Sequence, residues 1–324
     1  MPATSFGKAI NRALADAMEA DSTVVAMGED IGSAGGPFGV TRGLQERFGR
    51  TRVIDTPISE AAIAGAATGA ALSGLKPVVE IMFMDFTTLV MDAVVNQAAK
   101  AHFMFGGQRS VPMVLRTPHG GGLNAGPQHS QCLEAWFAHV PGLKVVCPAD
   151  APSAYGLMRS AIADPNPVLF VENKKLYAAK ADMPEAPGTV PIGEARIARR
   201  GRDVTVVAYG GVVATALAAA DTMATTGVEV EVVDLRSLQP WDTDAVLASL
   251  QRTHRVVIAH EAVKAFGVGA EIAATIAELG FDDLDAPIVR VGAAFMPVPY
   301  ATPLEASYLP AAGDIEAAIQ RTLE

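Results

Sequence analysis

The sequence predicts an α/β protein of two doubly wound domains, each with a mainly parallel sheet covered by helices on both faces. Short apolar segments alternate with helix-patterned segments along most of the chain, and this alternation is typical of parallel sheets. It is interrupted once, by prolines and scattered charges between residues 178 and 202. A chain of 324 residues is long enough for about two domains. We therefore expect a first domain over residues 1–185, a linker over 186–202 and a second domain over 203–324.

The first domain opens with an amphipathic helical pattern in its first 21 residues. After it, short apolar runs predict strands at residues 23–27, 52–54, 77–83, 112–117, 143–147 and 168–172. Between them, helices are expected near residues 44–48, 60–74, 87–104, 133–138 and 152–163. A long polar loop, residues 118–131, separates the fourth strand from the next helix.

The second domain repeats this alternation. Strands are expected at residues 204–210, 228–233, 256–259 and 288–291. Helices are expected at residues 212–226, 242–250, 269–279 and once within 304–324. No internal repeat of fixed period is present in the sequence.

Composition excludes several partners. The net charge of -10 argues against nucleic acid and against an acidic membrane surface. No uninterrupted apolar stretch reaches the ~18 residues that a membrane span needs. Half of the residues are nevertheless hydrophobic, which favours a large subunit interface. The first residues lack the apolar core of a signal peptide, and Cys132 and Cys147 are too few for a disulfide framework, so we expect a reducing cytoplasm.

Glu60 is the lone carboxylate at the start of a helix of small residues. Most residues from 61 to 74 are Ala or Gly, so another backbone can pack close to this helix. Glycines destabilise a helix interior relative to Ala, so Gly65 and Gly69 suggest such a close approach. The stretch alone favours a buried core helix with an acidic first turn.

The phosphate-binding and nucleophile signatures are mostly missing. No P-loop and no GxGxxG follows a strand. Tyr209-Gly210-Gly211 joins a strand to a helix and could hold an anion, although a tight turn is the simpler interpretation. His119-Gly120-Gly121-Gly122 resembles an oxyanion-hole motif, but the chain has no GxSxG serine elbow, so we reject a hydrolase.

His129 lies in the polar run Gln128 to Gln131 of the long loop. On this motif alone, a structural and a functional role are evenly balanced. The remaining candidates for metal ligands lack metal-ligand spacing and are read as structural: His102, His139, His254 and His260. Asp164 and Asn166 favour an Asx turn, with a cation site as the alternative.

Several segments in one order resemble a known family. They include GEDIGSAGGPFGVTRGLQERFG, the stretch from Arg52 to Phe86, QHSQ, HVPGLKVV, NPVLFVEN and DLRSLQPWD. Together they resemble the beta subunit of the thiamine-diphosphate-dependent first component of 2-oxo acid dehydrogenase complexes. The likeness runs from about residue 28 to the end and is densest before Tyr177. It implies a pyrimidine-binding domain followed by a domain of the transketolase C-terminal type.

The resemblance also implies partners and a reaction. It implies an α2β2 heterotetramer in which the alpha subunit holds the diphosphate through Mg2+, which is consistent with the absence of a GDG motif here. The expected reaction is oxidative decarboxylation of a 2-oxo acid, pyruvate above all, with acyl transfer to a lipoyl group. The lipoyl group belongs to a dihydrolipoyl acyltransferase core, which the second domain is expected to dock.

The resemblance assigns a role to individual residues of this chain. Glu60 matches the glutamate that bonds the aminopyrimidine ring, and His129 matches the histidine assigned to proton transfer during acylation of lipoate. The ring-lining residues of that half-site match Glu29, Ile58, Met82 and Phe86. A structural K+ site of part of the family matches the carbonyls of Met113, Ala161 and Ile162 together with Asp164 and Asn166.

The chain departs from the family pattern at two places. Asp92-Ala93-Val94 stands where DQI is usual, and Phe295 replaces an aspartate near the end. Three other functions remain as alternatives. An acetoin-cleaving dehydrogenase subunit shares the whole pattern. The C-terminal half of a split transketolase normally carries a different histidine loop, and a non-catalytic flavoprotein subunit would need a dinucleotide fingerprint that is missing.

Overall fold

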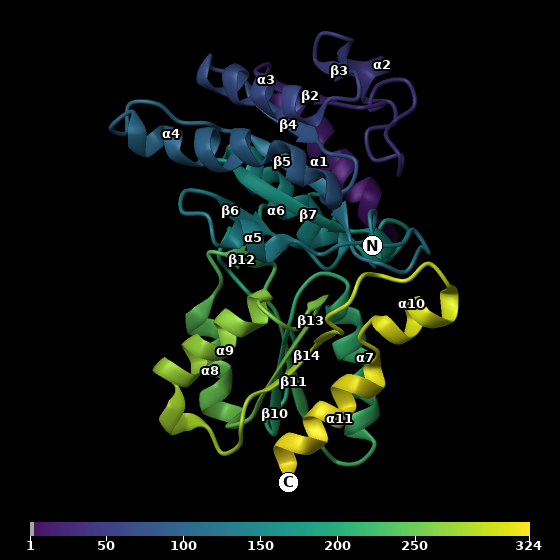
Figure 1. Cartoon of the computed structure of the whole chain (residues 1–324), viewed down its shortest axis with the longest axis vertical. Helices are drawn as coiled ribbons and strands as arrows, with labels where there is room; N and C mark the ends of the chain where they lie inside the picture. The colour runs from purple at the N-terminus through teal and green to yellow at the C-terminus, as the bar shows by residue number, and fades with distance from the viewer. Residues whose placement is uncertain (1–2) are drawn as a thin grey trace. The chain divides into compact units, whose positions relative to one another are not determined.

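The computed structural model describes residues 3–324, and the chain forms two compact units. The first unit holds the residues up to 119 and residues 136–192, and the second holds 120–135 and 193–324. Figure 1 shows the elements of both, coloured along the chain. Residues 120–135, which the sequence pattern assigns to the first domain, group with the second unit.

A parallel sheet forms the core of the first unit. Its strands lie in the order β6 (Lys144–Val146), β7 (Val168–Asn173), β5 (Val114–His119), β4 (Lys76–Glu80), β2 (Val24–Gly28) and β3 (Val53–Asp55). Every neighbouring pair among them is parallel. The strands are almost wholly buried, as apolar strands of a two-sided sheet must be. Their carboxyl ends meet at one edge, where open α/β sheets place ligand sites.

Helices α1 (Phe6–Ala20) and α6 (Ala151–Ala163) pack against each other in the first unit. The apolar face of α1 is buried in the core through Phe6, Ile10 and Leu14. The Ser5 side chain caps α1 by accepting the amide hydrogen bond of Lys8, at 3.4 Å. Other helices of this unit are α2 (Leu44–Phe48), α3 (Glu60–Leu72) and η3 (Lys174–Leu176).

The helix expected over residues 87–104 is three helical forms in series. A 3-10 segment, η1 (Met84–Val90), leads into a π-helix, η2 (Asp92–Ala98), and then into α4 (Ala99–Met104). The hydroxyls of Thr87 and Thr88 donate to carbonyls three residues earlier, at 2.6 and 3.1 Å. Such local bonds favour the tighter winding of η1, a preference that hydrophobic periodicity does not reveal.

The segment in which the alternation is interrupted, residues 178–202, contains two strands that the sequence does not suggest. β8 (Lys180–Asp182) pairs antiparallel with β1 (Ala3–Ser5). β9 (Arg196–Arg199) pairs antiparallel with a strand of the second sheet. Both are short edge strands with charged residues, so they lack the apolar run that predicts a buried strand.

The second unit contains a five-stranded sheet with helices on both faces. Its order is β14 (Val289–Ala293), β13 (Val256–Val263), β10 (Val204–Ala208), β11 (Val230–Asp234) and β9, and only β9 is antiparallel to its neighbour. Figure 1 shows α8 (Thr243–Thr253) and α9 (Val268–Leu279) on one face, with α7 (Val212–Ala224) and α11 (Ala312–Leu323) on the other. Four short elements complete the chain: α5 (Glu134–Ala138), β12 (Ser237–Gln239), η4 (Phe281–Asp283) and α10 (Thr302–Tyr308).

Within residues 3–324, none of the helices combines the length and the apolar character that crossing a bilayer requires.

Candidate functional site

Two buried glutamates lie at the carboxyl edge of the first sheet. Glu29 directly follows β2 and Glu60 is the first residue of α3, and each is only 8% exposed. The amide of Thr56 donates to the carbonyl of Gly28 at 3.0 Å. This bond fastens the segment before α3 to the end of β2, so Glu60 begins its helix at the same edge as Glu29.

The electrostatics of this edge favour a protonated carboxyl. The pKa of Glu29 is raised mainly by burial, and the nearby charges of Glu60, Asp30 and Glu80 raise it further. Within residues 3–324, the buried Oε1 of Glu29 has no hydrogen-bond partner. A buried polar atom in this state requires an explanation, and a ligand with polar ring atoms would supply one.

Apolar side chains accompany the two carboxyls. Ile58, two residues before Glu60, is 84% exposed. Met82 follows β4 and Phe86 lies in η1, and both are half-buried. The Phe86 ring meets Phe83 edge to face, with centroids 5.8 Å apart. The structure therefore offers polar atoms and apolar surface from neighbouring elements, as ligand sites do.

Sequence reasoning missed a buried ion network behind this edge. Arg116 on β5 donates to Oε1 and Oε2 of Glu172 on β7 at 2.7 and 2.8 Å, and to Oε2 of Glu80 on β4 at 2.5 Å. The Tyr177 hydroxyl donates to Glu172 at 2.7 Å. Burial raises the pKa of Glu80 despite the charge of Arg116. One charged residue near the end of each of three apolar strands was the available signal.

His129 belongs to the second unit, in the loop that follows β5. It is half-buried, and its amide donates to the carbonyl of Gly126 at 3.4 Å. Two glycines of the His119–Gly122 motif donate hydrogen bonds to side chains of the same unit. The amide of Gly121 donates to Oε1 of Glu261 at 2.6 Å, and that of Gly122 donates to Oε1 of Glu305 at 2.8 Å. These donors hold the loop in place instead of facing a substrate oxygen.

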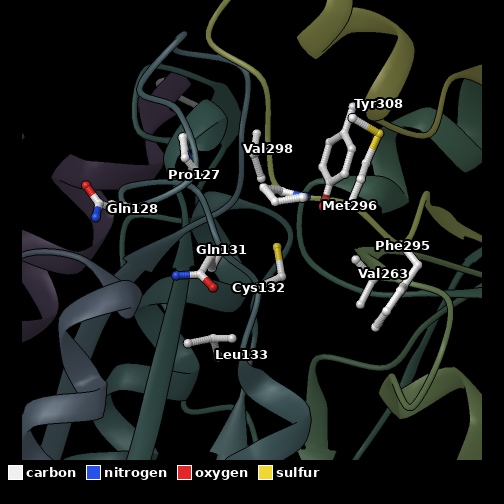
Figure 2. A pocket seen from close by; sticks show the side chains of 11 residues that line it. Pro127, Gln128, Gln131, Cys132, Leu133, Val263, Phe295, Met296, Val298 and Tyr308 are labelled. Carbon is white, nitrogen blue, oxygen red and sulfur yellow. The ribbon is translucent and has the colours of Figure 1, made fainter.

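An apolar cavity of about 520 Å3 lies beside the His129 loop, inside the second unit. Figure 2 shows Cys132 within it, between Gln131 and the wall made by Met296 and Tyr308. Burial raises the pKa of the Tyr308 hydroxyl to about 12, so this group stays neutral. The other lining residues are Pro127, Gln128, Leu133, Val263, Phe295, Pro297 and Val298.

The residues matched to a K+ site form a compact turn after α6. The carboxylate of Asp164 pairs with Lys144 and accepts the amide of Asn166 at 2.9 Å, which is an Asx turn. The carbonyl of Met113 accepts the amide of Val168 at 2.9 Å. Ala161 and Ile162 are buried at the end of α6, close in sequence to this turn. A turn accounts for these contacts, and the cation stays a prediction.

Comparisons with known proteins match both units. The model of the transketolase pyrimidine binding domain matches residues 3–180, and that of the transketolase C-terminal domain matches residues 193–315. The pyruvate dehydrogenase E1 component subunit beta-2, mitochondrial, of Oryza sativa subsp. japonica is 44% identical over 97% of this chain and 85% of its own length.

The chain belongs to the family of dehydrogenase E1 beta subunits. A second member, the acetoin:2,6-dichlorophenolindophenol oxidoreductase subunit beta of Bacillus subtilis (strain 168), is 47% identical over 94% of this chain and 93% of its own length. The pyruvate dehydrogenase E1 component subunit beta of Rhizobium meliloti (strain 1021) is 41% identical over 99% of this chain and 70% of its own length. The family resemblance and the fold class expected from the sequence are thus confirmed.

A solved structure agrees with the fold of this beta subunit. The protein described as "Split gene transketolase, inactive beta4 tetramer" superimposes with a TM-score of 0.80 over 99% of both chains. Its sequence is 23% identical, so the likeness concerns the fold alone.

Proposed function

We propose that this beta subunit supplies one half of a thiamine diphosphate site. The observation that carries the proposal is the buried carboxyl pair Glu29 and Glu60. Within residues 3–324, the Oε1 atom of Glu29 has no hydrogen-bond partner, and the pKa of Glu29 is raised. An aminopyrimidine ring carries polar nitrogens on its rim and an apolar face. Glu60 and Glu29 suit the nitrogens, while Ile58, Met82 and Phe86 suit the face.

The same edge is unsuited to the diphosphate end of that cofactor. Burial and the carboxyl groups of Glu60, Asp30 and Glu80 already disfavour the charged form of Glu29 here, so a diphosphate anion would be disfavoured as well. The diphosphate and its Mg2+ are therefore assigned to an alpha subunit. The exposed Ile58, beside a buried carboxyl, is consistent with a site that a second chain completes.

The cofactor would supply a carbon nucleophile for cleavage next to a carbonyl group. The chain's own residues would serve it in three ways. Glu60 would exchange a proton with the ring nitrogen, the role of a general acid–base group. Glu29 keeps a second proton nearby because its charged form is disfavoured. Phe86, whose ring contacts Phe83 edge to face, would pack on the cofactor ring and exclude water from that side.

The reaction proposed is oxidative decarboxylation of a 2-oxo acid, with pyruvate as first candidate, and acyl transfer to a lipoyl group carried by a dihydrolipoyl acyltransferase core. His129 is assigned the proton transfer during acylation. Acetoin cleavage is the second candidate, because a relative named for acetoin is 47% identical to this chain. The assembly proposed is an α2β2 heterotetramer, and a structural K+ at Asp164 and Asn166 is kept as part of this proposal.

Co-expression with an alpha subunit of the same family tests the proposal. We expect the purified beta subunit alone to be inactive, because it lacks the diphosphate half of the site. The complex should decarboxylate 2-oxo acids or cleave acetoin only when thiamine diphosphate and Mg2+ are added. A substrate panel then separates pyruvate, branched-chain 2-oxo acids and acetoin. Robust turnover by the isolated beta subunit would contradict a site shared between chains.

A further inference from the structure

The loop that leads to His129 contains three residues with left-handed backbone conformations. Gly122, Asn124 and Gly126 have φ values of +92°, +56° and +74°, and this left-handed region is sparsely populated for residues other than glycine. Leu123 and Asn124 are exposed. External contacts must therefore define the shape of residues 120–126.

Glu305 supplies the central contact. Its Oε1 accepts the amide of Gly122 at 2.8 Å and its Oε2 accepts the amide of Asn124 at 3.0 Å. The carboxylate is only 3% exposed, although it lies on the short helix α10 near the end of the chain. Two charge-assisted bonds from one buried carboxylate fix both the distance and the orientation of the loop.

Neighbours of Glu305 close the contact on either side. A Cβ atom on Gly126 would lie 2.1 Å from the Tyr300 ring, and one on Gly121 would lie 3.2 Å from Leu309. The side-chain amide of Asn124 donates to the carbonyl of Tyr300 at 3.0 Å. The segment Tyr300–Leu309 thus forms one continuous clamp on the loop, all within the second unit.

We propose that Glu305 is a positioning residue for His129: it fixes the loop from which the histidine acts in acyl transfer. Gly126 ends the clamped part of the loop, and its carbonyl accepts the amide of His129 at 3.4 Å. A shift of the Glu305 contacts is therefore passed on to the histidine within a few residues. The inference rests on the proposed function of His129 and gives helix α10, the second-last helix of the chain, a part in the reaction.

The step concerned balances as follows. The two electrons left on the substrate carbon by the departing CO2 reduce the S–S bond of the lipoyl group. One sulfur forms the thioester bond with that carbon. The other sulfur leaves as a thiolate and takes up one proton from the medium, so that the broken C–C and S–S bonds are replaced by one C–S bond and one S–H bond. His129 is the group assigned to move this proton, so its placement affects acylation and leaves decarboxylation unaffected.

The test uses Glu305→Gln in the complex of beta and alpha subunits. The amide keeps one acceptor but turns an NH2 group toward the second backbone N–H. We expect acyl transfer to lipoamide to fall about 10- to 100-fold, as for a small misplacement of a reacting group. Decarboxylation, followed with an artificial electron acceptor, should stay at the wild-type rate. Glu278→Gln, the same change on the exposed surface of α9, is the matched control.

A double variant distinguishes positioning from general damage. If Glu305 acts through His129, adding Glu305→Gln to His129→Ala should cause no further loss of acyl transfer. Additive losses, or equal losses in both half-reactions, would overturn the proposal. If Glu305→Gln does not assemble, Glu305→Asp, which keeps the charge but retracts it, should show the same selective loss. An unselective effect of His129→Ala alone would instead contradict the proposed role of the histidine.

Discussion

Glu60 can be tested by a change that preserves its shape. In Glu60→Gln the side chain still bonds the ring nitrogen, but it cannot share a proton as a carboxyl does. We expect kcat of the reconstituted complex to fall by about 10²- to 10⁴-fold, the usual contribution of a general acid–base group. Subunit assembly, measured by size-exclusion chromatography, should persist. Glu46→Gln, at an exposed position of α2, is the control. Wild-type turnover by Glu60→Gln would exclude a catalytic role for Glu60.

Arg116 is the residue on which the buried ion network depends. Arg116→Leu leaves Glu80 and Glu172 buried without their cation. Breaking such a network typically costs about 3–5 kcal/mol. Tyr177→Phe removes one bond to Glu172 and should cost about 1–3 kcal/mol. Urea unfolding of both variants checks this order, and a larger loss in Tyr177→Phe than in Arg116→Leu would show that the network is organised differently.

At the scale of an element, the start of α9 depends on a neutral histidine. His260 is fully buried, and its Nδ1 lies 3.1 Å from the carbonyl of Ala262, so Nδ1 carries the proton. A Cβ atom on Gly269 would lie 2.7 Å from Nε2. Nε2 therefore sits against the first turn of α9, where the positive end of the helix dipole disfavours a cation. Burial lowers the pKa of His260, opposed by the charge of Glu134 and aided by that of Arg290.

This arrangement predicts a pH dependence of stability. Because the folded pKa of His260 lies below its unfolded value of about 6.5, the unfolded chain binds more protons in acid. The contribution to stability is complete above that unfolded value and is lost as pH falls below it, by at most about 1.4 kcal/mol per pH unit. Urea unfolding at pH 7.5 and 5.5 should show a smaller loss for His260→Gln than for wild type. His139→Gln, at an exposed position, should behave as wild type, and equal losses in all three would refute the prediction.

At the scale of the whole molecule, the sequence predicts the parts that apolar patterning determines. The two α/β units and the strands of both parallel sheets follow from buried runs such as Val24–Gly28 and Val204–Ala208. β9 lacked that signal because it is an edge strand whose residues are all partly exposed, so it can carry arginines. The winding of η1 is favoured by the hydroxyl bonds of Thr87 and Thr88, which periodicity does not report.

The candidate site was predictable only in part, for a physical reason. Glu60 was noticed from the residues as the lone carboxylate at the start of a helix of small residues, and the family resemblance then gave roles to Glu60 and Glu29. Nothing in the sequence linked Glu305 to the glycines near His129, since that contact joins residues far apart in the chain through backbone amides. Long-range bonds to the backbone leave no side-chain pattern in the sequence. The roles of all the site residues, the cation ligands and the domain limits stay predictions.

Exposed apolar surface distinguishes this chain from an ordinary monomer. In the first unit alone, large apolar side chains are more than 80% exposed at Ile58 and Phe103, at 84% and 88%. On α3, the outward face is made of Ala61, Ala62 and Gly65, followed by Ala66 and Gly69. Small residues on a helix face allow another helix to approach closely. These features support the expectation that the chain has a large subunit interface.

Gly65 provides a test in which folding and assembly respond in opposite directions. A Cβ atom there has nothing within 4 Å, so Gly65→Leu fits the isolated chain and should raise its stability by about 0.5–1 kcal/mol through helix propensity. If α3 packs closely against another subunit, the same leucine blocks that contact and co-purification with the alpha subunit should fail. Gly313→Leu, an equally open helical position on α11, is the matched control and should assemble normally. Normal assembly of Gly65→Leu would show that the small-residue face of α3 is not a subunit contact.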